Sequence, residues 1–230
     1  MLTLLASLAA IDHVTPQRIQ EAVVFMVALI LSVAVHEYGH ARVADHLGDR
    51  LPRMQGRVTL NPLQHLDVWG TIVFPLLMIV SGAGMLGWGR PVRVSLRMPR
   101  YRHGLGPRAA HFLIAAAGPL MNVLFALVLS AAMVLALRGG MRRLGGEVLA
   151  PMIALNLGLA AFNLLPCPPL DGGALLTSVL GPDHAVSRFL SKYGPILFIG
   201  LLLSGVLAMV MSPAVTLSGL WLGRLFDWAL

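Results

Sequence analysis

The stretch AVVFMVALILSVAV, residues 22–35, carries no charged side chain and runs straight into HEYGH, residues 36–40. Its composition predicts an apolar helix, in which residues four apart lie one turn apart on the same face. His36 and His40 are therefore spaced to bind one metal ion, a pattern typical of zinc sites in which the intervening glutamate, here Glu37, acts as general base. Ionisable groups beside such a segment are costly to bury, which favours a functional role. The alternative is a pair of packing histidines.

The composition of the chain predicts a membrane protein. Of its 230 residues 57% are hydrophobic and only 12% are charged, whereas soluble domains carry about 25% charged residues. The length leaves room for one membrane-embedded domain over residues 1–230, with a core at 17–180 and C-terminal helices at 186–230. Cys167 is the single cysteine, which excludes an internal disulfide.

The net charge of +7 comes almost entirely from arginine. These arginines cluster between apolar segments, as expected of topology signals and contacts with lipid headgroups. Aromatic and basic residues do not alternate in the way that a nucleic-acid platform requires, so we expect a lipid bilayer and no nucleic acid as partner.

The apolar segments predict an all-α polytopic membrane protein with about five to six transmembrane or re-entrant segments. Polar residues at 49–67 resemble a short hairpin or strand, and Gly87 to Val94 has the alternation of an extended strand. We therefore expect a small extended or β-hairpin element near the active site. The five segments lie at about 16–47, 68–85, 109–137, 148–165 and 193–211, followed by a weaker apolar tail.

A catalytic zinc ion needs a third protein ligand, and Asp171 is the strongest candidate. It follows an apolar segment and the proline-rich break at 166–169, and broken helices of this kind commonly build ion sites in membranes. The alternative is an exposed aspartate that caps a helix. His65, Asp67 and Cys167 compete as ligands, and His65 is also a candidate to line the site entrance.

Two asparagines lie within apolar segments, where an amide needs hydrogen-bonding partners. Asn163 is a candidate to stabilise a developing oxyanion or to bind a substrate carbonyl, with a helix-packing amide as the alternative. For Asn122 we favour the packing role.

Five strings carry a resemblance to a known family: HEYGH at 36–40, NPLQHLD at 61–67, GWGRPV at 87–92, AGPLMN at 117–122 and NLLPCPPLDG at 163–172. Taken together, they resemble the site-2 protease family of intramembrane zinc metalloproteases. The resemblance covers residues 20–180, about two thirds of the chain. The strings at 61–67 and 87–92 resemble in particular the small bacterial and archaeal branch of the family. Neither a PDZ nor a CBS module is present, which puts gating of substrates by such modules in doubt.

The resemblance implies a function for each of these residues. His36, His40 and Asp171 would bind one zinc ion per chain, Glu37 would be the general base, and Asn163 would contact the substrate or the oxyanion. The substrate would be a transmembrane segment of another protein, and the enzyme would be a multi-pass protein of a bacterial or archaeal cell membrane. Two alternatives are a non-proteolytic zinc-binding membrane protein, such as a transporter or a pseudoprotease scaffold, and a zinc hydrolase of lipids or other small substrates.

Zinc binding also constrains topology, because His36 and Asp171 must lie at one membrane depth. Segments one and four should therefore run in the same direction, and segment three in the opposite one. Segment two should then be re-entrant or be paired with a return leg at 87–94, although an ordinary span is the alternative. Four arginines flank segment two on one side and six on the other, against three in the loop 138–147, so we expect both flanks in the cytoplasm.

Overall fold

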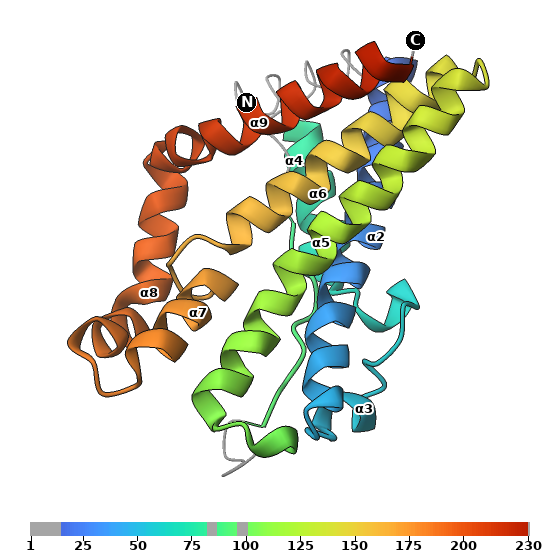
Figure 1. Ribbon diagram of the computed structural model, residues 1–230. Coiled ribbons are helices and arrows are strands. Elements are labelled where there is room, and N and C mark those ends of the chain that lie inside the picture. Colours follow the sequence, from blue (N-terminus) through green and yellow to red (C-terminus); the bar gives the residue numbers. More distant parts are fainter. Residues whose placement is uncertain (1–14, 82–86, 96–100, 230) are drawn as a thin grey trace.

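The computed structural model describes residues 15–81, 87–95 and 101–229, and within these ranges the regular secondary structure is helical. Five helices are long and apolar enough to cross a membrane, and Val68–Ile79 is a shorter apolar helix. This confirms an all-α polytopic fold (Figure 1). The elements are α2 Pro16–His46, α3 Leu51–Met54, the 3-10 turn η2 Pro62–Gln64, the π-helical turn η3 Val68–Val73, α4 Phe74–Ser81, η4 Arg102–Gly104, α5 Pro107–Arg138, η5 Leu144–Leu149, α6 Ala150–Asn163, α7 Asp171–Leu180, α8 Ala185–Leu203 and α9 Val206–Ala229.

Helices α2, α5 and α6 pack together around the site, and α7 supplies its third candidate ligand. As Figure 1 shows, α2 and α6 run in the same direction and α5 runs against them, as the depth argument predicts. Small residues allow close packing, because a Cβ on Gly39 would lie 2.6 Å from the carbonyl oxygen of Ala117 in α5. Helix α2 begins at Pro16 and ends before Gly48, whose φ of 100° stops the helix, both as predicted.

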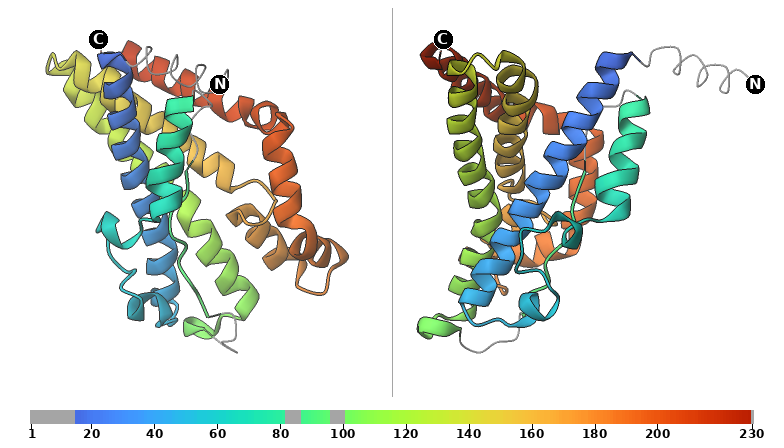
Figure 2. Two further views of the ribbon diagram at one scale, coloured as in Figure 1. Left: turned by 180° about the vertical axis from the view of Figure 1, so that it is seen from behind. Right: turned by 90° about the vertical axis from the view of Figure 1, so that its right-hand side faces the viewer.

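Residues 87–95 form the predicted return leg. The amide of Trp88 donates to the carbonyl of Gly70 (3.0 Å), and the amide of Arg90 donates to the carbonyl of His65 (2.9 Å). The later residue of the return leg, Arg90, thus bonds to the earlier residue, His65. The two segments therefore run antiparallel, and after α4 the chain returns beside α2 (Figure 2). Residues 82–86 and 96–100, which include two of the arginines counted on the flanks of segment two, lie outside the described residues. The cytoplasmic location of the flanks stays a prediction.

The hairpin predicted at 49–67 is wrong. Pro52 lies in the first turn of α3, and Pro62 begins η2, which Asn61 caps by accepting a hydrogen bond from the amide of Leu63. Each proline lacks the N–H that a strand ladder needs, while it suits a helix start. The polar alternation of this segment therefore encodes short helical turns and not strands.

The predicted fifth segment at 193–211 has the wrong boundaries. Helix α8 ends at Leu203, Gly205 has φ 73°, and α9 begins at Val206. The chain therefore forms two helices where hydropathy alone joins them. Helix α9 packs against α6 and α5, so the weaker apolar tail is a full helix.

Candidate metal centre and active site

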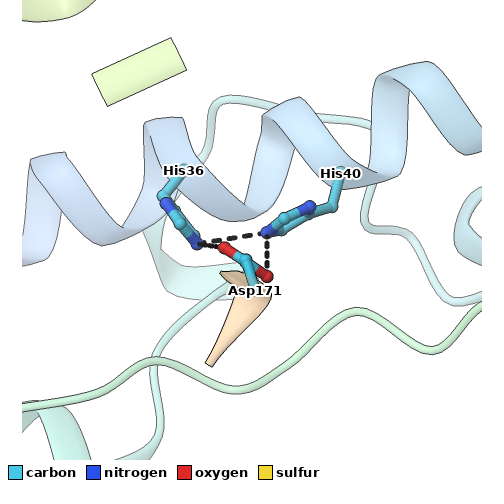
Figure 3. A group of neighbouring side chains, drawn as sticks. All are labelled: His36, His40 and Asp171. Carbon is cyan, nitrogen blue, oxygen red and sulfur yellow. Dashed lines mark hydrogen bonds and ion pairs between the residues drawn. The ribbon is translucent and has the colours of Figure 1, made fainter. Parts of the chain in front are cut away.

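Three side chains from two distant segments meet at one point (Figure 3). His36 Nε2 and His40 Nε2 lie 3.1 Å apart, and the carboxylate of Asp171 lies 3.2 Å from the first and 3.4 Å from the second. Atoms that are 2.0–2.1 Å from one tetrahedral zinc ion lie about 3.3 Å from each other. The separations therefore match a single zinc site.

The turn between α6 and α7 delivers Asp171 to the histidines. Asp171 is the first residue of α7. A Cβ on Gly172 would lie 2.3 Å from the carbonyl oxygen of Leu164, and a Cβ on Gly173 would lie 2.6 Å from the backbone nitrogen of Pro168. The chain folds back this tightly only because both positions lack a side chain.

Hydrogen bonds on the far side of both imidazoles fix their protonation. His36 Nδ1 lies 2.6 Å from Asn122 Oδ1, and His40 Nδ1 lies 2.7 Å from the carbonyl oxygen of Ile114. Both partners are acceptors, so each Nδ1 carries the proton and each Nε2 has a free lone pair. Asp171 Oδ2 is also buried without a hydrogen bond from a described residue. Three electron-pair donors that converge in this way need a cation between them, and this donor set suits zinc.

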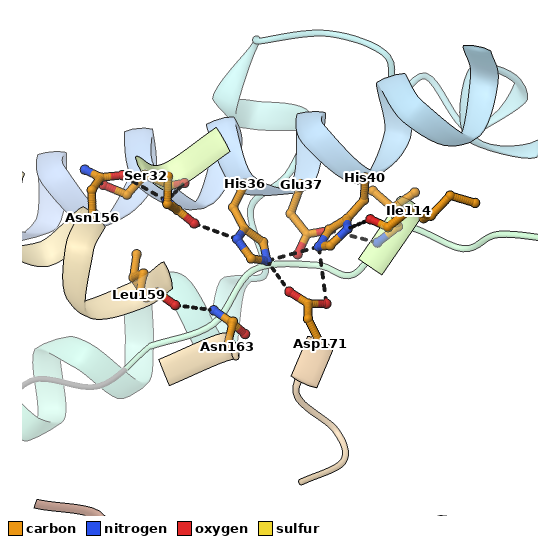
Figure 4. Close-up of polar contacts among 11 residues, drawn as sticks. Ser32, His36, Glu37, His40, Ile114, Asn156, Leu159, Asn163 and Asp171 are labelled. Atoms are coloured by element: carbon orange, nitrogen blue, oxygen red, sulfur yellow. Dashed lines mark hydrogen bonds and ion pairs between the residues drawn. The ribbon is translucent and has the colours of Figure 1, made fainter. Parts of the chain in front are cut away.

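A buried amide network leads away from His36 (Figure 4). The Asn122 amide donates to the carbonyl of Ser32 (3.2 Å) and to Asn156 Oδ1 (2.9 Å). Asn156 in turn donates to Ser32 Oγ (2.8 Å) and to the carbonyl of Met152 (2.8 Å). Because both N–H groups of Asn122 are used, its oxygen must face His36. Asn122 thus fulfils the predicted packing role and also orients a candidate ligand.

Glu37 lies beside the three candidate ligands and is only 9% exposed. Its Oε2 accepts a hydrogen bond from the amide of Val92 (2.9 Å), which lies on the return leg. This bond fixes the carboxylate through one oxygen and leaves the other for a water molecule. Glu37 also lines two adjoining cavities of about 390 and 440 Å³.

Asn163, at the end of α6, borders the same two cavities. Its amide donates to the carbonyl of Leu159 (3.0 Å), the residue one turn earlier in α6. The side chain is half-buried, and its second N–H group and its oxygen are not committed to that bond. This position suits contact with a substrate carbonyl or an oxyanion, and the bond to Leu159 also suits a helix-packing amide.

The three competing ligands lie elsewhere. His65 is fully buried and does not line the entrance, because its Nε2 donates to the carbonyl of Thr59 (2.8 Å); burial also lowers the pKa of His65. Asp67 caps η3 by accepting from the amide of Gly70. Cys167 points towards a backbone carbonyl, and burial raises the pKa of its thiol.

The sequence analysis missed Ser32, Asn156 and Gly118. Ser32 lies one helical turn before His36, and Asn156 is a polar residue in an apolar helix, so both carried the signal that identified Asn163. Gly118 belongs to the AGPLMN string, but nothing in that string shows that the position must lack a side chain. A Cβ on Gly118 would lie 2.3 Å from His40 Nε2 and 2.6 Å from His36 Cε1, so the absence of a side chain there makes room for the site.

Comparisons with known proteins agree with this geometry. The chain is 36% identical to YwhC of Bacillus subtilis over 195 residues, which cover 82% of this chain and 84% of YwhC. It is 28% identical to Rip2 of Mycobacterium tuberculosis over 224 residues, covering 96% of this chain and 79% of Rip2. The names of both relatives place them among the zinc metalloproteases. No solved structure matches significantly. The model of Peptidase family M50 matches residues 24–143 and 145–207, so the chain belongs to this family, the site-2 proteases, and is a membrane-embedded zinc metalloprotease.

Proposed function

We propose that this enzyme cuts transmembrane segments of other proteins within the cell membrane of a bacterium or an archaeon. The observation that carries the proposal is the position of Glu37. It lies beside the convergent side chains of His36, His40 and Asp171, and among helices that are apolar enough to span a bilayer. A protease of soluble substrates has no need of such surroundings.

Each residue has a distinct role in the proposed reaction. His36, His40 and Asp171 hold the metal ion, and bound zinc supplies Lewis acidity that polarises the scissile carbonyl and lowers the pKa of water. Glu37 takes a proton from the attacking water and transfers it to the leaving amine. Asn163 donates an N–H group to the carbonyl oxygen as negative charge develops there.

The substrate must be extended when it reaches this site, because helical carbonyls are occupied by their own hydrogen bonds. The return leg supports strand addition. The amides of Trp88, Arg90 and Val92 all donate towards the protein. Amides alternate in direction along an extended chain, so those of Gly89 and Arg93 point to the opposite side, where an unwound substrate segment would pair.

The test compares Glu37→Gln with wild type on membrane-protein substrates. Mass spectrometry of membranes that contain either enzyme should find new protein termini within transmembrane segments only with wild type. The glutamine cannot accept a proton, and loss of a general base costs about 10²–10⁴-fold in rate. Glu147→Gln is the matched control, because Glu147 is exposed and borders neither cavity; it accepts a hydrogen bond from Gln20 and pairs with the exposed Arg143.

Zinc analysis completes this test. Glu37→Gln should retain zinc, whereas Asp171→Ala should lose it. Cleavage by Glu37→Gln within threefold of wild type would refute the general-base role, and full zinc content in Asp171→Ala would refute the ligand assignment.

The role of Asn163 needs its own measurement. Loss of one oxyanion donor costs about 10²–10³-fold in kcat, so Asn163→Ala should fold, bind zinc and cleave poorly. An unstable variant with normal activity per folded molecule would assign Asn163 to packing.

A further inference from the structure

We propose that two side-chain subsites of opposite character flank the scissile bond, so that the enzyme prefers a bulky apolar residue on one side of the bond and a small or polar residue on the other. This inference rests on the proposed function and adds the class of sequence that is cut. It follows from the lining of the two cavities that meet at Glu37.

The larger cavity, of about 440 Å³, is an apolar subsite with aromatic walls. Phe74 and Trp88 form one wall, with ring centroids 5.2 Å apart, and Phe162 and Phe198 form the other, with centroids 6.0 Å apart. All four rings are only partly buried or exposed, so they offer apolar surface to an incoming side chain. Aromatic walls of this kind favour large apolar and aromatic groups.

The second cavity, of about 390 Å³, has a mixed lining and forms the other subsite. His111, Thr177 and Ser178 contribute polar groups, and no Phe or Trp of the described part of the chain borders this cavity. The rest of its lining includes the aliphatic side chains of Val92, Val94 and Ile114 and two alanines, Ala115 and Ala174. This subsite therefore offers hydrogen bonds and little aromatic surface.

The geometry of an extended chain connects the two subsites. Both cavities are bordered by His36, Glu37 and Asn163, so they adjoin at the catalytic groups. Successive side chains of an extended chain point to opposite faces. The two residues that flank a bond held at Glu37 therefore enter different cavities.

The test uses a single-span reporter protein whose ten central transmembrane positions are randomised, with cleaved termini identified by mass spectrometry. We expect bonds with Leu, Met, Phe or Trp on one side and Gly, Ala, Ser, Thr or Asn on the other. An apolar pocket distinguishes side chains that differ by one methylene by about 10–200-fold, so the bulky preference over alanine should reach at least tenfold.

Phe198→Ala separates the two subsites. Loss of this ring should reduce the preference for bulky residues about tenfold and leave the preference on the other side of the bond unchanged. Phe189→Ala is the matched control, because Phe189 lies on the same helix, is 51% exposed and borders neither cavity.

The outcomes distinguish this inference from the proposed function. Glu37-dependent cleavage with no side-chain preference, or with a preference that Phe198→Ala does not change, would overturn the subsites and leave the function intact. Absence of Glu37-dependent cleavage for every member of the library would overturn both.

Discussion

Two walls of the active site hold their functional groups by different means. The helical wall, made of α2, α5 and α6, uses neutral amides. His36 bonds to Asn122, and Asn122 bonds to Asn156, with each of these side chains almost wholly buried. Buried polar networks are stable when every member is satisfied, and this one leaves each amide oxygen and N–H group with a partner.

The loop wall, residues 57–73 and 87–95, has little regular structure and is held by side chains that bond to backbone. Arg57 donates to the carbonyls of Gln64 and Arg90, and Thr71 Oγ1 donates to the carbonyl of Trp88 (2.7 Å). These bonds replace the ladder that a β-hairpin would have supplied.

The helical wall and the loop wall have different tasks. The helical wall orients the histidines that would bind metal, while the loop wall holds Glu37 through the amide of Val92. Changes in the helical wall should therefore weaken zinc binding, and changes in the loop wall should lower turnover at full zinc content.

The largest effect is expected from Gly118→Ala in the helical wall. The added Cβ would overlap His40 Nε2 at 2.3 Å, so one imidazole must leave its position. Zinc affinity should fall by more than about 100-fold, beyond the 10–100-fold that is typical when a group supporting a ligand is lost. Metal titration of purified protein measures this.

Gly158→Ala is the control for this substitution. Among the described residues, no atom outside the adjoining helix backbone lies within 4 Å of a Cβ at position 158, and alanine is favoured over glycine in a helix by about 0.8–1.0 kcal/mol. This variant should bind zinc normally. Normal zinc affinity in Gly118→Ala as well would show that the helical wall is more adaptable than its packing suggests.

These two walls also mark what the sequence could and could not predict. The helical wall was largely predictable, because the spacing of His36 and His40 and the hydropathy of the segments are local properties. The depth argument then gave the directions of α2, α5 and α6 correctly. The partner of Asn122 was not predictable, since the bond to Asn156 joins residues 34 apart on different helices.

The loop wall was harder to predict because its structure depends on distant bonds. The alternation of residues 57–60 favours a strand locally, yet His65 and Arg57 bind the backbone of this segment and of the return leg. The return leg itself was predicted from the need to bring His36 and Asp171 to one depth. A physical constraint at the site therefore gave more information here than local propensity.

The second prediction tests the amide network. Asn122→Leu removes the acceptor that holds His36 Nδ1 and should weaken zinc binding about 10–100-fold. Asn156→Leu removes a group one bond further away and should have a smaller effect. Ser130→Ala is the control, because Ser130 is buried in the same helix as Asn122 but bonds to Ala126 and Trp221 instead. Equal zinc affinity of Asn122→Leu and wild type would contradict the division between the walls.

The third prediction concerns the loop wall. Arg57 is 3% exposed, and its guanidinium bonds to both segments of this wall, 57–73 and 87–95. Arg57→Met should therefore release the return leg and displace Val92. Turnover should fall about tenfold, part of the 10²–10⁴-fold that a general base contributes, while zinc content remains unchanged. The control is Arg53→Met, which removes an exposed guanidinium that pairs with Asp45 of α2 and makes no contact with the return leg among the described bonds. Zinc loss in Arg57→Met would show that the two walls are not independent.

The smallest expected effect is a pH dependence of the loop wall that His65 causes. Burial holds the pKa of His65 below its unfolded value of about 6.5, so the folded state favours the neutral ring that donates to Thr59. Stability from this group is complete above pH 6.5 and is lost as the pH falls below it, because the unfolded chain then binds the proton more readily. Hydrogen exchange of the amides at 57–66 should therefore accelerate a few-fold between pH 7.5 and 5.5, after correction for the intrinsic rate.

His65→Gln keeps a donor for Thr59 but does not titrate, and the acceleration should vanish in that variant. The Asn122 and Asn156 amides do not titrate either, so exchange in α5 and α6 should change equally in both proteins. An acceleration at 57–66 that persists in His65→Gln would assign the pH response to another group and remove His65 from the forces that hold the loop wall.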